Sequence, residues 1–196
     1  MFRRAGALVV ALALSACGHV PAKTMWQLRH FDPMTTDAGR LRAAVAMPKE
    51  ALPQKGGAKL VLAQARKGGA DKETLEIVLE EVSLATETGL AAVKPKKGQE
   101  LRAFRIPPAE LPRLAEAREK ARARAAKEPG AFEGTLSIGI DGCRVEGAPL
   151  PEEFRVSTWM KTAETGEYVT LLDDVDLVAL VGAEKLAAEA KVCPAS

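Results

Sequence analysis

The amino-acid sequence predicts an α+β domain, with a mainly antiparallel sheet of about six or seven strands and two helices packed on it. Short apolar runs with strand-like alternation recur along the chain, and turn residues rich in glycine and proline separate them. Two longer stretches show apolar residues at helical spacing. Because short hairpin connections join most of the runs, we expect antiparallel neighbours with the helices on one face.

Two apolar runs open the domain. Residues 42–47 predict a strand that ends at Pro48. Residues 59–63 predict a second strand, because glycine pairs at 56–57 and 68–69 bound the run on both sides.

Residues 73–84 fit two structures. Leu75, Ile77 and Leu79 alternate as in a strand, whereas Leu75, Val78, Leu79 and Val82 also fit a helical stripe after Asp71 as a cap. We favour the strand, with a bulge near Glu80 and Glu81 to explain the change of phase.

The middle of the chain contains the clearest helix. Residues 101–106 alternate and predict a strand that Pro107 ends. Residues 109–127 keep helical spacing through Leu111, Leu114, Ala117 and Ala121, and Pro129-Gly130 stops them.

The last third predicts three strands and a helix. Residues 135–140 alternate most regularly, with Leu136, Ile138 and Ile140 facing inward. Residues 155–161 and 167–172 predict a hairpin around Gly166. Residues 176–191 predict the second helix.

The N-terminus has the features of an export signal. Arg3 and Arg4 precede an apolar run over residues 5–14, which is too short to span a bilayer but suits a cleavable signal. The sequence Leu14-Ser15-Ala16-Cys17 follows directly.

This tetrapeptide resembles the lipobox of bacterial lipoproteins. The resemblance covers residues 1–17 and implies cleavage between Ala16 and Cys17 and acyl chains, such as palmitate, on Cys17 that anchor the protein in a membrane. Gly18 in place of an aspartate favours the outer membrane, facing the periplasm. The alternatives are an ordinary signal peptide or an N-terminal helix with an incidental cysteine.

Three segments follow from this interpretation. Residues 1–16 form the signal peptide, 17–39 a lipid-anchored tether and entry segment, and 40–196 a single α+β domain. In the entry segment we expect apolar side chains to pin the chain onto the domain: Met25, Trp26, Leu28 and Phe31.

Composition argues against a nucleic-acid partner. The chain has 28 basic and 26 acidic residues, and removal of Arg3 and Arg4 leaves the mature protein formally neutral. Aromatic residues are few, so stacking platforms for bases are not expected.

Two cysteines remain after Cys17. An exported protein meets an oxidising compartment, so Cys143 and Cys193 predict one disulfide, with two separate buried thiols as the alternative. A metal site is not expected from them, because the chain has only two histidines, His19 and His30.

The sequence shows no catalytic motif and implies no cofactor. There is no nucleophile elbow, zinc-protease motif or phosphate-binding loop. The acidic run from Asp173 to Asp176 lacks a calcium-loop pattern and reads as a helix start. An enzyme would need two carboxylates that converge in a cleft, with candidates Glu80, Asp141 and Asp173.

The central helix concentrates positive charge. Two interpretations fit its basic residues. The helix could bind an anionic lipid surface or an anionic polymer, or its basic face could be solvated, with the positive charge balanced by the acidic segment 144–176. The candidates for anionic-surface contacts are Arg113, Arg118, Lys120, Arg122, Arg124 and Lys127.

The leading hypothesis for function is a non-catalytic binding or scaffolding domain, anchored in the membrane, with an envelope protein or lipid as partner. The second is a carrier with an apolar cavity lined by aromatic residues, and the third is the carboxylate enzyme. The candidate cavity residues are Trp26, Phe31, Phe104, Trp159 and Tyr168.

Overall fold

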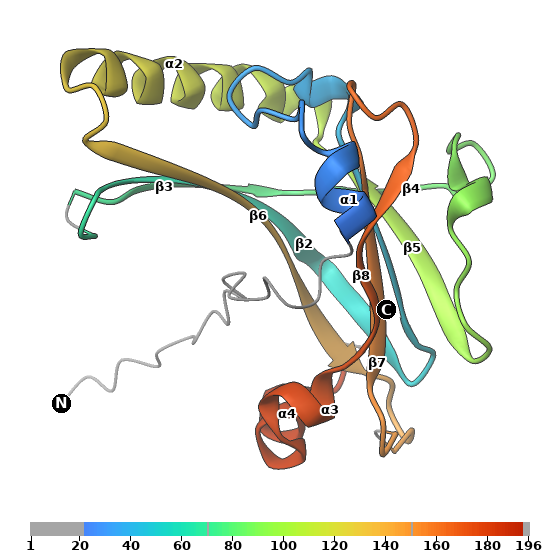
Figure 1. The fold of residues 1–196 in the computed structure, drawn as a ribbon. Coiled ribbons are helices and arrows are strands. Elements are labelled where there is room, and N and C mark those ends of the chain that lie inside the picture. The colour runs from blue at the N-terminus through green and yellow to red at the C-terminus, as the bar shows by residue number, and fades with distance from the viewer. Residues whose placement is uncertain (1–21, 70, 150, 194–196) are drawn as a thin grey trace, which may run out of the picture.

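The computed structural model describes residues 22–69, 71–149 and 151–193, and it shows an α+β fold with two antiparallel sheets (Figure 1). Sheet A has five strands in the order β4-β5-β1-β7-β8. These are β4 (Glu80–Val82), β5 (Gln99–Arg105), β1 (Arg42–Pro48), β7 (Arg155–Lys161) and β8 (Tyr168–Asp176). Sheet B has the order β3-β2-β6 and contains β3 (Glu73–Val78), β2 (Ala51–Arg66) and β6 (Phe132–Arg144).

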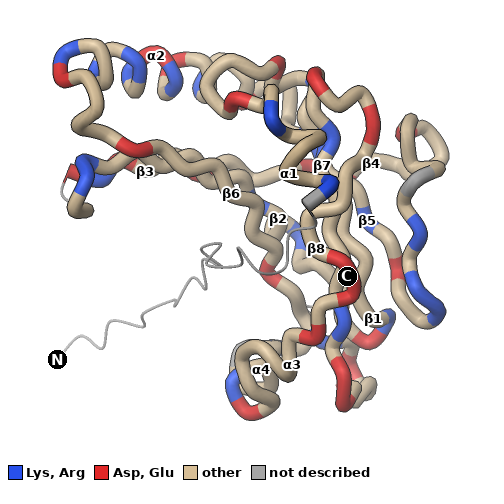
Figure 2. Tube along the Cα trace, viewed as in Figure 1, with Lys and Arg blue, Asp and Glu red and all other residues tan. Residues whose placement is uncertain are grey.

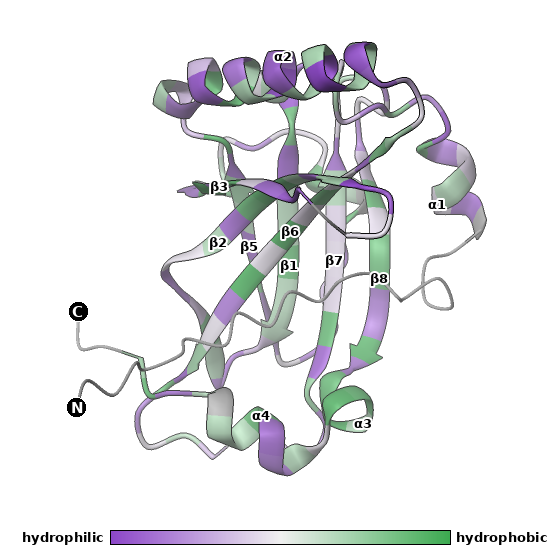
Figure 3. Ribbon diagram, turned by 90° about the vertical axis from the view of Figure 1, so that its left-hand side faces the viewer, coloured by the Kyte–Doolittle hydropathy of each residue, from purple (hydrophilic) through white to green (hydrophobic). Residues whose placement is uncertain are grey.

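One long helix and several short ones complete the fold. The α-helices are α1 (Ala22–Gln27), α2 (Leu111–Lys127), α3 (Leu177–Val181) and α4 (Ala183–Glu189). Three short 3₁₀ helices are η1 (Ala38–Arg40), η2 (Leu90–Ala92) and η3 (Pro108–Glu110). Figure 3 shows α2 across one end of the strands and α3 and α4 at the opposite end.

The predicted fold class is confirmed, but the strands form two sheets instead of one. The change occurs at Leu79, which lies between β3 of sheet B and β4 of sheet A. Leu79 is buried, and its N–H donates to the carbonyl of Ala58 at 2.8 Å. The strand favoured for residues 73–84 is therefore present, while the expected bulge is a passage from one sheet to the other.

The predicted C-terminal helix is broken in two. Gly182 lies between α3 and α4 with φ at 90°. Glycine reaches this left-handed region readily because it has no Cβ. The helix predicted from the spacing of Leu177 to Leu186 is therefore present on both sides of Gly182, and the glycine ends the first of the two helices.

The main core lies between the two sheets. Leu60 and Ile77 of sheet B belong to one buried cluster with Val45 and Phe104 of sheet A. Half-buried side chains of β6 pack against the same cluster: Leu136, Ile138 and Ile140. The inward direction predicted for these three residues is therefore confirmed.

A second cluster covers the other face of sheet A. Ala44, Ala103, Trp159 and Tyr168 lie there, and Val93 packs on them from the segment between β4 and β5. Both faces of β1 are consequently covered, which explains why its residues are buried without alternation.

Helix α2 packs through a narrow buried stripe. Leu114, Arg118 and Ala121 are its buried residues, spaced as one helical face requires. Gln64 of β2 donates from Nε2 to the carbonyl of Ala121 at 2.9 Å, which ties the helix to sheet B.

The entry segment forms a short helix, α1, beside β8. Thr24 is buried and donates from Oγ1 to the carbonyl of Thr170 at 2.5 Å. Phe31 packs against the main core, as expected. Met25 and Trp26 do not pin the segment, because they are 64% and 65% exposed, and that expectation was wrong.

Candidate functional site

Cys17, which is expected to carry the lipid, and Ala16, which is expected to precede the cleavage site, lie outside the described residues. The first described element after them is α1, which begins at Ala22. Within the part of the chain that the structure describes, no helix has both the length and the apolar character needed to span a membrane.

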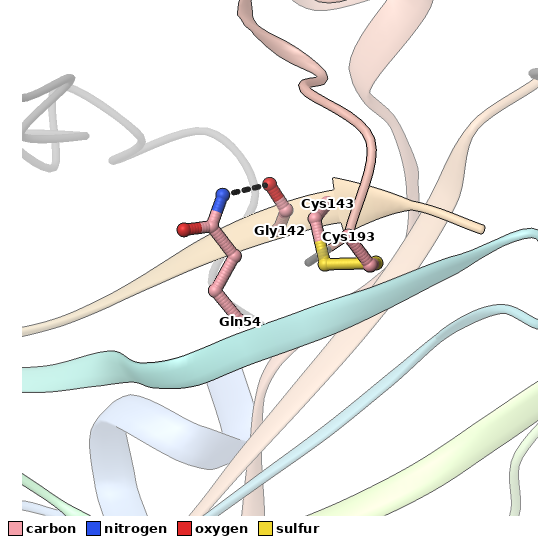
Figure 4. The surroundings of a disulfide bond; sticks show 4 residues. All are labelled: Gln54, Gly142, Cys143 and Cys193. Atoms are coloured by element: carbon pink, nitrogen blue, oxygen red, sulfur yellow. Dashed lines mark hydrogen bonds between the residues drawn. A yellow bond between two sulfur atoms is a disulfide. The ribbon is translucent and has the colours of Figure 1, made fainter. Parts of the chain in front are cut away.

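Cys143 and Cys193 form the predicted disulfide, with their Cα atoms 4.9 Å apart (Figure 4). Hydrogen bonds flank it, because Arg144 donates from its N–H to the carbonyl of Lys191 at 2.7 Å and accepts from the N–H of Cys193 at 2.8 Å. Gln54 of β2 donates from Nε2 to the carbonyl of Gly142 at 3.2 Å. The disulfide therefore fastens the segment after α4 to the end of β6, at the point where β6 pairs with β2.

Three basic residues of α2 are paired with acidic neighbours one helical turn away. Arg113 contacts Glu110 at 2.9 Å, Lys120 contacts Glu116 at 2.7 Å, and Arg122 contacts Glu119. Lys120 donates a hydrogen bond to the Glu116 carboxylate, and this bond together with the positive charge holds the pKa of Glu116 below its usual range. Figure 2 shows both signs of charge interleaved along the helix.

The other basic candidates of α2 have different surroundings. Arg118 is buried and donates to the carbonyl of Thr36 at 2.9 Å, and burial lowers its pKa from the ordinary value. Arg124 contacts Glu73 of β3 at 2.8 Å and lies 4.7 Å from the ring centre of Phe132. Lys127 is exposed in the last turn. The positive charge of α2 is therefore offset largely by its own neighbours.

The three candidate carboxylates lie in different places. Glu80 pairs with Arg105 within sheet A, and Asp141 lies 3.6 Å from the ammonium of Lys59 in sheet B. Asp173 is exposed on β8. Among the described residues, no group of three or more His, Cys, Asp or Glu side chains is arranged to hold a metal ion.

The acidic run at the end of β8 begins a helix, as the sequence predicted. The Asp176 carboxylate accepts from the N–H of Val178 at 3.0 Å and so caps α3. It also accepts from the N–H of Phe154 at 3.1 Å. A shallow surface hollow of about 320 Å³ lies beside this run, lined in part by Asp173 and Leu180.

The five aromatic candidates are not brought together. Phe104 lies in the core between the sheets, Trp159 and Tyr168 lie in the cluster on the other face of sheet A, and Trp26 is exposed. Phe31 lies at the margin of the main core. The described residues therefore do not gather these side chains around one cavity.

A buried charged cluster escaped the sequence analysis. The carboxylate of Glu87 is only 8% exposed, and it lies 3.3 Å from Arg42 and 3.2 Å from Lys161. Lys161 also donates to the carbonyl of Thr88 at 2.7 Å. These contacts fasten the segment between β4 and β5 over sheet A. No local pattern indicated this cluster, because the three charged residues are far apart along the chain.

Four strands form the edges of the two sheets, and three of them are short, charged or covered. β4 has three residues, and β3 carries Glu73 and Glu76, which are both ion-paired. β8 is contacted by α1, since its Thr170 carbonyl accepts from Thr24. These are the usual ways in which proteins keep sheet edges from pairing with other chains.

The fourth edge, β6, is a long strand whose two acidic residues, Glu133 and Asp141, lie toward its ends. Within the described residues it pairs along one side with β2, and at Arg144 it forms one parallel bridge to Val192. From Phe132 to Cys143 it carries no basic residue, and its exposed positions include Gly134, Thr135 and Gly139. We define residues 132–142 of β6 as the open edge.

The sequence predicted the strand that forms the open edge but not its place at the edge of a sheet. The alternation of residues 135–140 predicted the strand, and its glycines indicated small outward-facing positions. Its place at the edge of a sheet depends on the pairing of β2 with both β3 and β6, which a single sequence does not reveal. No protein-family model, no curated protein and no solved structure matches this chain.

Proposed function

We propose that this chain is a lipid-anchored protein of the bacterial envelope whose domain binds an extended segment of another envelope protein along the open edge of β6. The observation that carries the binding function is this long edge strand, whose central residues 134–140 are uncharged. Its outward backbone N–H and C=O groups are the donors and acceptors that an added strand requires.

The anchor and the compartment have separate support. The lipobox-like sequence that ends at Cys17 favours acylation, and the disulfide between Cys143 and Cys193 suits an oxidising compartment. A domain held at a membrane and carrying an open edge is suited to holding a second protein there. No reaction is required for this function.

The geometry of β6 favours an added strand in two ways. Ser137 and Gly139 lie opposite Val61 and Lys59 on the face of sheet B away from the core. On the other face, Leu136, Ile138 and Ile140 remain half-buried, so an added strand would extend the apolar surface between the sheets. Backbone hydrogen bonds would supply affinity, and the alternating side chains would supply specificity.

A photo-reactive amino acid placed on the open edge tests this proposal in intact cells. We would introduce it singly at Ser137 and Gly139, and at Thr74 on β3 as the control on the opposite edge of the same sheet. We expect a discrete protein adduct from the β6 positions that is absent from the β3 position.

A blocking substitution then tests the mode of binding. A Cβ added at Gly139 meets nothing within 4 Å, so Gly139→Lys places a charge on the open edge without a clash. We expect it to reduce the adduct formed at Ser137 at least tenfold, while Thr74→Lys leaves it unchanged. Equal adducts at both edges, or a co-purifying lipid with no protein adduct, would contradict strand addition.

The anchor requires its own experiment. Cys17→Ser should abolish labelling of the protein by fatty acid and release it from membranes. Unchanged labelling in this variant would show that the acyl chains are not on Cys17.

A further inference from the structure

The first described helix exposes apolar side chains that the fold does not use. Met25 and Trp26 of α1 are 64% and 65% exposed, while Thr24 of the same helix is buried against β8. α1 is therefore fixed to the domain by one face and presents its opposite face to the outside. Exposed tryptophan and methionine side by side are unusual enough on a soluble surface to suggest a contact.

Two basic residues accompany these apolar side chains. Lys23 and Arg29 are both exposed, and the guanidinium of Arg29 lies 3.7 Å from the ring centre of Trp26. Arg29 also donates to the carbonyl of Trp26 at 2.8 Å, which fixes it over the ring. We define Lys23, Met25, Trp26 and Arg29 as the α1 patch.

The charge of this segment differs from that of the rest of the mature chain. From Cys17 to Phe31 the sequence contains Lys23 and Arg29 and no aspartate or glutamate, whereas the mature protein is formally neutral. A tryptophan ring beside basic side chains matches the interface between lipid headgroups and acyl chains, where tryptophan is enriched and anionic headgroups attract lysine and arginine.

The position of the patch, close in sequence to Cys17, favours such a contact. Residues 18–21 alone separate Cys17 from α1. Even a fully extended chain of this length spans only about 18 Å between Cys17 and Ala22. A lipid on Cys17 would therefore hold the patch close to the bilayer, where a short tether makes even a weak contact effective.

We propose that the α1 patch docks on the anionic surface of the membrane that holds the anchor, with Trp26 at the level of the headgroups, and so sets the orientation of the domain. This inference rests on the lipid anchor of the proposed function. Docking of α1 would fix the domain in one orientation relative to the bilayer, because Thr24 joins α1 to β8 and Phe31, in the segment after α1, packs against the core.

Tryptophan fluorescence tests the docking directly. The chain has two tryptophans, and Trp159 is buried, so Trp159→Phe leaves Trp26 as the single reporter. The full lipidated protein in this background would be reconstituted into vesicles of phosphatidylethanolamine and phosphatidylglycerol. We expect a blue-shifted Trp26 emission and at least twofold quenching by lipids brominated near the headgroup.

Reversing the charges of the α1 patch distinguishes docking from simple closeness of the domain to the bilayer. Lys23→Glu with Arg29→Glu should abolish the shift, while Lys94→Glu with Lys97→Glu, two exposed lysines in the segment between β4 and β5, should preserve it. If the protein still floats with the vesicles but the Trp26 emission is that of a solvent-exposed tryptophan and is not quenched, the docking proposal is wrong and the anchor stands.

A second experiment with protein that lacks the lipid tests the docking independently of the anchor. Cys17→Ser protein mixed with an excess of the same vesicles should show the Trp26 shift at higher lipid concentration, and reversal of Lys23 and Arg29 should raise that concentration roughly tenfold or more. Absence of any shift at saturating anionic lipid would overturn the docking. Absence of acyl chains on Cys17 by mass spectrometry would instead overturn the anchor.

Discussion

Arg118 of α2 donates a hydrogen bond of 2.9 Å to the backbone carbonyl of Thr36, and both residues are almost completely buried. Thr36 in turn donates from Oγ1 to the carboxylate of Glu164 at 2.9 Å. A continuous chain of hydrogen bonds thus joins the long helix, the entry segment and the turn between β7 and β8. The stem of Arg118 also packs in this interior, which a solvated helix residue would not do.

We expect Arg118→Ala to lower the free energy of unfolding by about 1–3 kcal/mol, because it leaves the buried carbonyl of Thr36 without its donor. Urea unfolding followed by tryptophan fluorescence measures this. Arg113→Ala is the matched control, since the side chain of Arg113 is 57% exposed and its pairing with Glu110 should contribute less than about 0.5 kcal/mol. Equal losses in the two variants would refute the role assigned to Arg118.

The single tyrosine provides a pH-dependent signal. Burial raises the pKa of Tyr168 above its ordinary value of about 10, the negative charge of Glu87 adds to this, and Arg42 opposes it. Since the folded pKa is the higher one, the contribution of Tyr168 to stability is complete below pH 10. It is lost as pH rises from about 10 toward the folded value.

Ultraviolet absorbance of tyrosinate measures this without interference, because the chain has one tyrosine. At pH 10 we expect almost no tyrosinate in the folded protein and about half ionisation of the tyrosine in urea, where its ordinary pKa of about 10 applies. Glu87→Gln removes the neighbouring charge and should move the folded titration to lower pH. A folded midpoint at the unfolded value would contradict the buried environment of Tyr168.

Loss of the disulfide should destabilise the domain without removing a strand. The bond closes a loop of 50 residues, and chain entropy alone predicts a loss of roughly 4 kcal/mol from Cys143→Ser with Cys193→Ser. The thermal midpoint should fall on reduction in the wild-type protein and not in the double variant. We expect α3 and α4 to lose amide protection first, because the bond fastens the segment that follows them.

Two glycines offer a contrast between a crowded and an open backbone. A Cβ at Gly57 would lie 2.6 Å from the carbonyl oxygen of Asp141 and 3.0 Å from that of Gln54, whereas one at Gly139 meets nothing within 4 Å. We expect Gly57→Ala to lower the free energy of unfolding by about 2 kcal/mol or more and Gly139→Ala to be neutral or slightly stabilising. Thermal unfolding of the two variants side by side would decide this.

Local pattern was enough to find most elements of this fold. The strand predicted at 155–161 matches β7, and the helix predicted at 109–127 matches α2 with the 3₁₀ turn η3 before it. The hydrophobic alternation of Leu136, Ile138 and Ile140 correctly identified the buried face of β6. Each of these signals depends on residues within one element, so the sequence contains it directly.

Features that depend on distant residues were not predictable in this way. The division into two sheets depends on which strands Val78 and Glu80 pair with on either side of Leu79. The cluster around Glu87 depends on three segments that meet only after folding. The exposure of Trp26 was mistaken for burial, because an apolar side chain in sequence does not reveal which face of a short helix the domain covers.

The pairing of β2 with both β3 and β6 has a consequence for the time course of folding. β3 follows β2 closely in the sequence, whereas β4, β5 and α2 lie between β3 and β6 in the sequence. Such non-local pairing is slow. During that delay one backbone edge of β2 stays unpaired and prone to aggregation. A chaperone that covered β2 during this interval would therefore favour correct folding.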